Sequence, residues 1–432
     1  MIGFVGLSHL GLNYSLATAA KGFDVVAFDP DPGLVSRCAA GNFPIEEPGF
    51  SDLFLKHGGR LRYTADAGEL SGCDLVFISL DVATDDRNES DLDPLRDLIH
   101  RTIPHLSPET TLVVLSQVTP GFTRQLAAGL VGQSKFGIYY QVETLIFGRA
   151  VERAMNPERY IVGAADPAKP LPMAFQAWHA VFGCPVLTMR YESAELAKIA
   201  INFFLVSTVA TTNTLAEVCE AIGADWDEIA PALRLDRRIG PHAYLKPGLG
   251  IAGGNLERDL VTVQALASRY GTDAGIVSAW QRNSVYRRDW ALRILHREVL
   301  SRLPHPPRIA VWGLAYKENT HSIKNSPSVE MLHALRGFDI HAYDPAARID
   351  PGAIPTFIRD VNALESLEDV DVLLVMTPWK EFSSISCEEI SKRMRGRIVI
   401  DPYGLLDEQA CVAAGLQCFR LGKSAGSGRG AC

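Results

Sequence analysis

Residues 2–29 read IGFVGLSHLGLNYSLATAAKGFDVVAFD and contain the pattern on which the fold prediction rests. An apolar run, IGFV, is followed by a glycine turn, a helical pattern from Leu10 to Lys21, and a second run, DVVAFD. Similar runs recur as DLVFISL and TLVVLS, and near the end as RIAVWGL, FDIHAYD, DVLLVMT and GRIVID. Such alternation of short apolar runs with helical segments is typical of βαβ units. We therefore predict an α/β fold with two Rossmann-like, doubly wound parallel-sheet domains.

The turn after the first run predicts a dinucleotide site. Gly6 begins the turn, Gly11 lets the helix pack closely on the strand, and the carboxylate of Asp29 is placed to accept hydrogen bonds from adenosine ribose hydroxyls. Ser8 replaces the middle glycine of the usual pattern, so its side chain either crowds the pyrophosphate or bonds to it. The acid at position 29 favours NAD over NADP. The alternative to a dinucleotide site is a turn that starts a helix and binds no ligand. The expected cofactor-binding residues are Gly6, Ser8, His9, Leu10, Gly11 and Asp29.

A long helix is expected between the two sets of strands. Residues 191–225 read YESAELAKIAINFFLVSTVATTNTLAEVCEAIGAD, without a proline. This pattern predicts a helix of about thirty residues, which spans two domains or pairs with a second copy of the chain. A glycine-rich loop, RIGPHAYLKPGLGIAGGNLERDL, and a helical stretch from Leu260 to Leu300 follow. With a linker at LPHPP, we predict an N-terminal domain at 1–190, a central helical region at 191–303 and a C-terminal domain at 304–432.

The composition limits the possible partners. The chain is 47% hydrophobic and 21% charged, which is typical of folded globular proteins. A net charge of -8 argues against capture of nucleic acid or an anionic membrane. We see neither an apolar run as long as a membrane span nor a signal peptide, and we expect a cytoplasmic protein. The eight cysteines form no C-x-x-C pair and no zinc-like cluster with histidine, so no metal is expected.

Several segments occur in an order and spacing that resemble one known family. They are GNFPIEEPGF, SQVTPGFT, ELAKIAINFF, the glycine-rich loop, GLAYKENTHSIKNSP and TPWKEF. The chain resembles the nucleotide-sugar 6-dehydrogenases, the UDP-glucose and GDP-mannose dehydrogenase family. This resemblance implies an N-terminal NAD domain, a helical dimerisation core, and a C-terminal domain that helps to bind a nucleotide-activated sugar. It also implies that the chain forms a homodimer.

The sequence departs from the family at positions that serve its second oxidation. In the family the glycine loop reads approximately GFGGSCFPKD, and its cysteine forms a thiohemiacetal with the C6 aldehyde. Here the loop reads GIAGGNLERD, and Asn255 replaces the cysteine. An amide has no thiolate and is not a covalent nucleophile. The family segment NPEFLREG aligns with QVETLIFG, which keeps Glu143 but has Phe147 in place of the second glutamate, and Gln117 replaces a threonine.

Other family positions are kept. Lys198 and Asn202 lie four residues apart on the long helix, so they share one face. By resemblance, these two residues and Asp259 surround the reacting sugar hydroxyl. A solvated Lys198 is the alternative, but its apolar neighbours favour a buried functional lysine. The expected catalytic set has Lys198 as acid or base, tuned by Asp259 or Glu143, with orienting roles for Asn202, Gln117 and Asn255, although Asn255 is equally suited to packing the loop.

The substrate-binding prediction rests on the loop and on the C-terminal domain. Backbone amides around the loop glycines are able to hold a diphosphate. By resemblance, Lys317 matches a family lysine near the substrate, whereas Lys324 and Tyr403 replace family arginines. These changes suggest a different sugar or nucleotide, with UDP, ADP and GDP all open. The expected substrate-binding residues are Gly250, Gly253, Gly254, Lys317, Lys324 and Tyr403.

An NAD site without a covalent nucleophile favours one reversible hydride transfer. Our preferred hypothesis is a nucleotide-sugar epimerase that acts by transient oxidation, with C4 of the sugar as the first candidate. Inversion at C5 through a C6 aldehyde is a second route. A two-electron dehydrogenase that releases its carbonyl product uses the same residues, and a non-catalytic nucleotide-sugar binder is the third alternative.

Overall fold

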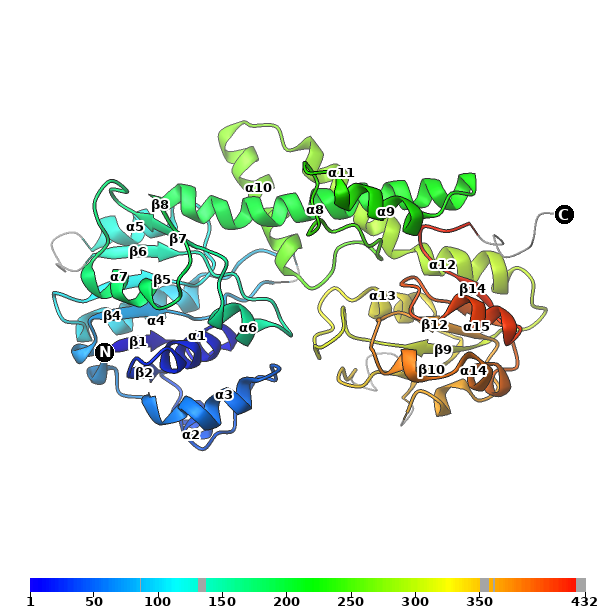
Figure 1. The fold of residues 1–432 in the computed structure, drawn as a ribbon, viewed down its shortest axis with the longest axis horizontal. Coiled ribbons are helices and arrows are strands. Elements are labelled where there is room, and N and C mark those ends of the chain that lie inside the picture. The colour runs from blue at the N-terminus through cyan, green and yellow to red at the C-terminus, as the bar shows by residue number, and fades with distance from the viewer. Residues whose placement is uncertain (86, 131–136, 350–356, 360–361, 425–432) are drawn as a thin grey trace. The chain divides into compact units, whose positions relative to one another are not determined.

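Parallel strand pairing organises both ends of the chain (Figure 1). The computed structural model describes residues 1–432 except 86, 131–136, 350–356, 360–361 and 425–432. Within these limits the chain forms two units, residues 1–201 and 202–432, and each unit is built on one sheet. The predicted pair of Rossmann-like domains is therefore confirmed. The predicted three-part division at 190 and 303 is not tested by this architecture and stays a prediction.

The first sheet has the strand order β3-β2-β1-β4-β5-β6-β7-β8. Its central strands are buried along their whole length, as their apolar sequences require when helices cover both faces of a sheet. The strands are β1 Ile2–Val5, β2 Val25–Phe28, β3 Leu61–Thr64, β4 Leu75–Ile78, β5 Thr111–Val114, β6 Ile138–Gln141, β7 Tyr160–Ala164 and β8 Val186–Arg190. The helices are α1 His9–Ala20, α2 Pro32–Ala39, α3 Phe50–His57, α4 Asp93–Thr102, α5 Phe122–Gly129, α6 Ala150–Met155 and α7 Met173–Ala180.

Successive residues of the strands supply two separate cores, because their side chains alternate between the faces of the sheet. Phe4 of β1 packs in a cluster with Tyr14 of α1 and Trp178 of α7. The next residue, Val5, packs in a cluster on the other face with Leu95 of α4. The helices thus cover both sides of the sheet, and its carboxyl edge remains the place where the loops gather.

One strand departs from the predicted all-parallel arrangement. β7 pairs antiparallel with β6, through Tyr140 with Gly163 and Gln141 with Val162, and then parallel with β8. An antiparallel neighbour needs no full crossover helix, and the connection from β6 to β7 contains only the short helix α6. The strands that carry the predicted cofactor turn remain parallel.

The second sheet repeats the same topology in the order β11-β10-β9-β12-β13-β14. Its strands are β9 Arg308–Trp312, β10 Asp339–Tyr343, β11 Phe357–Arg359, β12 Val372–Val375, β13 Ile398–Ile400 and β14 Gln417–Phe419. Helices α13 Pro327–Ala334, α14 Cys387–Arg393 and α15 Glu408–Ala413 belong to this sheet domain. All strand pairs are parallel.

The predicted long helix is present as α8, Tyr191–Ile222, which contains 32 residues. It is followed by α9 Trp226–Leu235, α10 Asn255–Tyr270, α11 Gly275–Arg288 and α12 Trp290–Leu295, and by a π-helical turn at His296–Leu300. The helical stretch expected from Leu260 to Leu300 is divided into separate helices. Gly271 ends α10 in a left-handed conformation with φ of 68°, and the chain turns before α11 begins.

Helix α8 is also the one helix among the described residues that is long and apolar enough to cross a membrane. Its most apolar window is 39% buried inside the protein. The sequence analysis found no uninterrupted apolar run as long as a membrane span, whereas this helix meets the looser criterion of mean hydropathy over 18 residues. One such helix is weak evidence for a membrane, because long core helices of folded proteins have the same length and composition.

A buried carboxylate joins α8 to the first sheet domain. Glu195 is fully buried and accepts hydrogen bonds from the N–H groups of Gly121, at 2.6 Å, and Thr123, at 2.8 Å. These N–H groups lie at the start of α5 and have no acceptor within that helix. Glu195 therefore caps α5 from a distant part of the chain.

We predict that Glu195→Ala lowers the midpoint of thermal unfolding by about 5–10 °C, because two buried N–H groups lose a charged acceptor. Glu192→Ala is the control, since Glu192 pairs with Arg124 at an exposed position and its loss should change the midpoint by no more than about 2 °C. Equal midpoints for the two variants would contradict the assigned role.

Candidate functional site

The predicted cofactor turn lies at the carboxyl end of β1. Gly6 has a φ of 97°, and its N–H donates to the carbonyl of Phe28 at 2.9 Å. A Cβ atom on Gly11 would lie 1.9 Å from the carbonyl oxygen of Gly6. Both glycines are therefore required by the backbone, and α1 is held against the end of the strand as the sequence predicted.

Asp29 is buried directly after β2 and can accept further hydrogen bonds. Its Oδ2 accepts from Leu7 N–H at 2.8 Å and its Oδ1 from Asp31 N–H at 3.0 Å. A carboxylate has about four acceptor positions, so ribose hydroxyls can still bind. Asp344 occupies the matching position after β10, but there both oxygens are heavily used, by the N–H groups of Leu314, Ala315, Ala346 and Ala347 and by Nε1 of Trp379.

Ser8 bonds to its own chain. Its hydroxyl donates to the carbonyl of Ser79 at 3.0 Å and accepts from Asp81 N–H at 2.9 Å. Asp81 in turn accepts from Leu10 N–H at 3.2 Å, in the first turn of α1. Sequence reasoning missed Asp81, although an acid directly after the apolar run DLVFISL was a usable signal, because parallel strands end at the same edge of a sheet.

His9 is paired with a second acid that was missed. Its Nε2 lies 2.7 Å from Oε1 of Glu47, and its ring centroid lies 4.2 Å from that of Phe147. Burial alone raises the pKa of Glu47, but hydrogen bonds from His9 and from the N–H groups of Gly148 and Ala150 hold it below its usual value. The segment GNFPIEEPGF thus contributes Glu47, which links α1 to the loop after β6.

Lys198 and Glu143 form an ion pair in the first unit. Nζ of Lys198 lies 2.7 Å from Oε1 of Glu143, and the two side chains are only 12% and 15% exposed. Glu143 also accepts from Leu145 N–H at 3.0 Å, which fixes its second oxygen. Asp259 and Glu143 were the two acids expected to tune Lys198, and Glu143 is the one that pairs with it. Gln117 lies half-buried in the loop after β5.

Asn202 and Asp259 meet in the second unit. Nδ2 of Asn202 donates to Oδ2 of Asp259 at 2.5 Å, and both residues are buried. Nε of Arg258, also buried, lies 3.5 Å from Oδ1 of Asp259. Arg258 was not singled out from the sequence, where it reads as one charge of the loop. Asn255 is the exposed first residue of α10.

The predicted loop glycines serve packing within the chain. Gly250 and Gly253 have φ of 80° and 97°, and a Cβ on Gly253 would lie 2.5 Å from the ring of Tyr316. The Gly253 N–H donates to the carbonyl of Lys324, and that of Gly254 to the carboxylate of Glu257. Because these amides have acceptors within the chain, the diphosphate-binding role of the loop stays a prediction.

The C-terminal candidates lie beside or beyond that loop. Nζ of Lys317 lies 5.5 Å from the ring centroid of Tyr316, so Lys317 and Lys324 belong to the segment on which the loop packs. Tyr403 is half-buried in the turn after β13, and its N–H donates to Asp401 at 3.3 Å. Burial raises the pKa of the Tyr403 phenol, and burial raises that of Asp401 to about 6.

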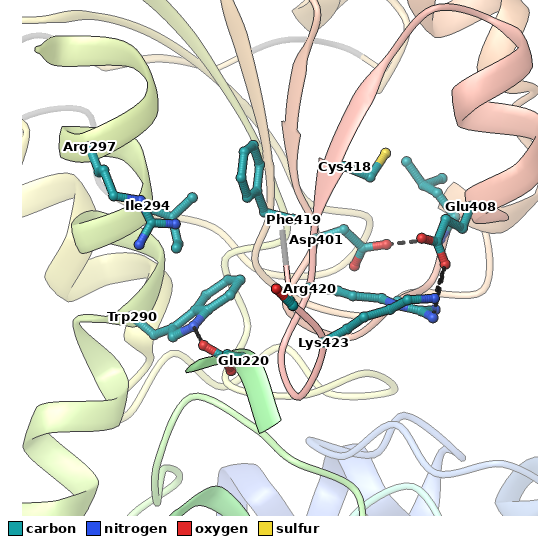
Figure 2. A pocket seen from close by; sticks show the side chains of 13 residues that line it. Glu220, Trp290, Ile294, Arg297, Asp401, Glu408, Cys418, Phe419, Arg420 and Lys423 are labelled. Carbon is teal, nitrogen blue, oxygen red and sulfur yellow. Dashed lines mark hydrogen bonds and ion pairs between the residues drawn. The ribbon is translucent and has the colours of Figure 1, made fainter. Parts of the chain in front are cut away.

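A cavity of about 180 Å³ in the second unit is lined by none of the residues that the sequence singled out (Figure 2). Its charged groups are matched within the chain. Arg420 and Lys423 reach Glu408 at 3.0 and 2.7 Å, and Nε1 of Trp290 donates to Glu220 at 2.8 Å. The cavity therefore adds no chemical group to the candidate site. Among the described residues, no three His, Cys, Asp or Glu side chains gather to hold a metal ion.

The fold and the site define a class of protein. A Rossmann-like unit with a glycine turn, and with an acid placed to bind a ribose, is followed by a long helix and a second Rossmann-like unit. This arrangement is suited to a dinucleotide-dependent oxidoreductase. Family models agree in order along the chain: the NAD binding domain of the UDP-glucose/GDP-mannose dehydrogenase family matches residues 1–180, its central domain 192–284, and its UDP binding domain 310–408. The chain belongs to the UDP-glucose/GDP-mannose dehydrogenase family.

Individual relatives are distant but match along nearly their whole length. A putative UDP-glucose 6-dehydrogenase, YtcA, of Bacillus subtilis is 28% identical over 427 residues, which are 97% of this chain and 99% of that protein. The UDP-glucose dehydrogenase of Pyrobaculum islandicum is similar in structure, with a TM-score of 0.81 and 27% identity over 93% of both chains. The UDP-D-ManNAc dehydrogenase of Pyrococcus horikoshii has a TM-score of 0.84 at 23% identity, with 98% of this chain and 99% of that chain covered.

The cofactor is NAD, as the family model and the turn both indicate. The turn fits a dinucleotide in two respects. Its glycines allow close approach of the backbone, and Asp29 keeps acceptor capacity for a ribose. The first turn of α1 supplies N–H groups for a pyrophosphate, although one of them donates to Asp81.

We predict that Asp29→Asn weakens NAD binding about tenfold and narrows the preference for NAD over NADP, because the variant loses the charge that repels a 2′-phosphate. Binding of both dinucleotides is measured by titration calorimetry. Asp31→Asn, an exposed change of the same charge two residues away, is the control. An equal loss of affinity for NAD and NADP would indicate a purely structural role for Asp29.

Proposed function

We propose that this protein is an NAD-dependent nucleotide-sugar epimerase that acts by one reversible hydride transfer, with C4 of the sugar as the first candidate. Family membership supports the broader statement that it is an NAD-dependent oxidoreductase of nucleotide sugars. The narrower proposal is carried by Asn255, which begins α10 and which the resemblance aligns with the family's nucleophilic cysteine. No cysteine occurs in the loop 238–260, so the covalent adduct required for a second oxidation has no thiol.

The chemistry balances without a net oxidant. NAD, when bound, supplies a hydride acceptor that can return the hydride. Loss of a hydride from the sugar carbon and of a proton from its hydroxyl leaves a carbonyl, and the reverse on the opposite face gives the epimer. Each complete turnover leaves the cofactor in its starting oxidation state.

Two polar pairs are suited to the hydroxyl and its proton. We assign Lys198, oriented by Glu143 at 2.7 Å, to hold and return the hydroxyl proton. Asn202, oriented by Asp259, presents its carbonyl oxygen as a hydrogen-bond acceptor for the sugar. We assign Gln117 and Asn255 to orientation of the ring, and Lys317, Lys324 and Tyr403 to the nucleotide.

A two-electron dehydrogenase is the second candidate. It uses the same residues, but its cofactor must leave after every turnover. The two candidates differ in NADH yield.

The test is the stoichiometry of NADH formation with UDP-glucose, UDP-GlcNAc and UDP-ManNAc as substrates. We expect formation of an epimer with catalytic NAD and no accumulation of NADH. One NADH for each sugar, with a released carbonyl product, would establish the second candidate. Two NADH for each sugar, with a uronic acid, would contradict both.

We predict that Lys198→Met lowers epimer formation at least about 100-fold and leaves NAD affinity unchanged, because proton transfer is lost while the turn is intact. Lys169→Met is the control, since the side chain of Lys169 is 78% exposed on the same unit. Unchanged turnover by Lys198→Met would remove Lys198 from the mechanism.

We also propose a cytoplasmic homodimer that forms through α8. Phe204, Leu215, Val218 and Ile222 recur on one face of this helix and are 77%, 45%, 46% and 71% exposed. Large apolar side chains at this spacing favour a protein partner, here a second copy of the chain.

We predict that Phe204→Glu shifts the protein from dimer to monomer in light scattering, because the charge opposes burial of this face. Leu55→Glu is the control, since Leu55 is 83% exposed on α3 and is far from α8 in sequence. A wild-type monomer, or an unchanged dimer in the variant, would contradict the proposed interface.

A further inference from the structure

The N-terminus of α1 lacks a cap from its own first residue. The first N–H groups of any helix have no acceptor within that helix, and they form a natural site for an anion such as a pyrophosphate. Ser8 stands at the N-cap position, but its side chain accepts no hydrogen bond from the helix. Its hydroxyl is used by the carbonyl of Ser79 and the N–H of Asp81.

Asp81 supplies the missing acceptor from the loop after β4. Its Oδ2 lies 3.2 Å from Leu10 N, and its own N–H is fixed by the hydroxyl of Ser8 at 2.9 Å. Ser8 and Asp81 therefore act together. The hydroxyl of Ser8 orients the backbone of Asp81, and the carboxylate of Asp81 accepts a hydrogen bond from the Leu10 N–H of the helix. A negative charge is favourable at this end of a helix, so the arrangement is stable without a ligand.

The same position matters for a dinucleotide, because its pyrophosphate carries two negative charges and needs the N–H groups of this turn. Leu7 N–H already donates to Asp29, and Leu10 N–H donates to Asp81. Two of the amides between Gly6 and Gly11 are thus bound to carboxylates. An incoming pyrophosphate meets the charge of Asp81 at an amide that it would use.

We propose that Asp81 is a built-in competitor for the pyrophosphate, which lowers the affinity for NAD and makes the cofactor exchangeable. This inference rests on the proposed oxidoreductase function and concerns the same site. Weaker binding of NAD leaves the chemistry of epimerisation unchanged, because NAD has to stay bound only until one turnover is complete.

The surroundings of Asp81 support the assignment. Asp81 is an exposed residue, and desolvation of its carboxyl group raises its pKa. His9, the Leu10 N–H and Ser8 act in the opposite direction, and the charge of Glu143 raises the pKa further. A pyrophosphate bound beside Asp81 would add negative charge next to a carboxylate whose charged form is already disfavoured by desolvation.

The test compares wild type with Asp81→Asn and Asp81→Ala by titration calorimetry. The first variant removes the charge and keeps an acceptor, and the second removes both. We expect each variant to bind NAD and ADP-ribose about tenfold more tightly, since one repulsive charge is removed near the pyrophosphate. Binding of adenosine, which has no phosphate, should not change. Asp97→Asn is the control, because Asp97 is exposed on α4 and its loss alters net charge equally.

Several results would overturn the inference. If wild type and both Asp81 variants bind NAD equally, Asp81 does not compete with the pyrophosphate, and the proposed function stands. If both variants bind NAD more weakly while their thermal midpoints are unchanged, Asp81 is a ligand of the dinucleotide instead. If wild type and variants bind no NAD at all, the inference and the proposed function both fail.

Discussion

The site depends on the close contact between Gly11 and the carbonyl of Gly6. Because Gly11 has no Cβ, α1 can start directly at the end of β1, and its N-terminal amides lie beside the acids that follow β2 and β4. The second unit has a similar turn, in which the Gly313 N–H donates to the carbonyl of Tyr343 and the Leu314 N–H donates to Asp344. There the carboxylate is saturated by its own chain, which explains why the dinucleotide function belongs to the first unit.

Several of the polar candidate residues occur as pairs, each within one unit of the chain. Glu143 holds Lys198, Asp259 holds Asn202, and Ser8 holds Asp81. A buried charge needs such a partner, since an isolated one is costly. The arrangement supports binding, orientation and proton transfer, whereas a covalent adduct has no thiol in the loop. For this reason we propose one hydride transfer and not two.

The sequence predicted what depends on local pattern. Buried strands, the glycine turn and α8 follow from hydrophobic periodicity and from positions that require glycine, and the structure confirms them. It did not predict Asp81 or Glu47, because each reaches α1 from a segment far away in the chain. The loop glycines were interpreted as a phosphate site, but their spacing does not tell whether the backbone approaches a ligand or, as here, Ser284 and Tyr316. Whether the loop also binds a diphosphate stays a prediction.

We propose that one hydride leaves the sugar and returns to the same carbon. The most direct measurement uses UDP-glucose with deuterium at C4 and follows the products by mass spectrometry and NMR. We expect the C4 epimer with the deuterium retained at C4, and no sugar acid. A uronic acid formed with deuterium still at C4 would show that oxidation takes place at C6 and would contradict hydride transfer at C4.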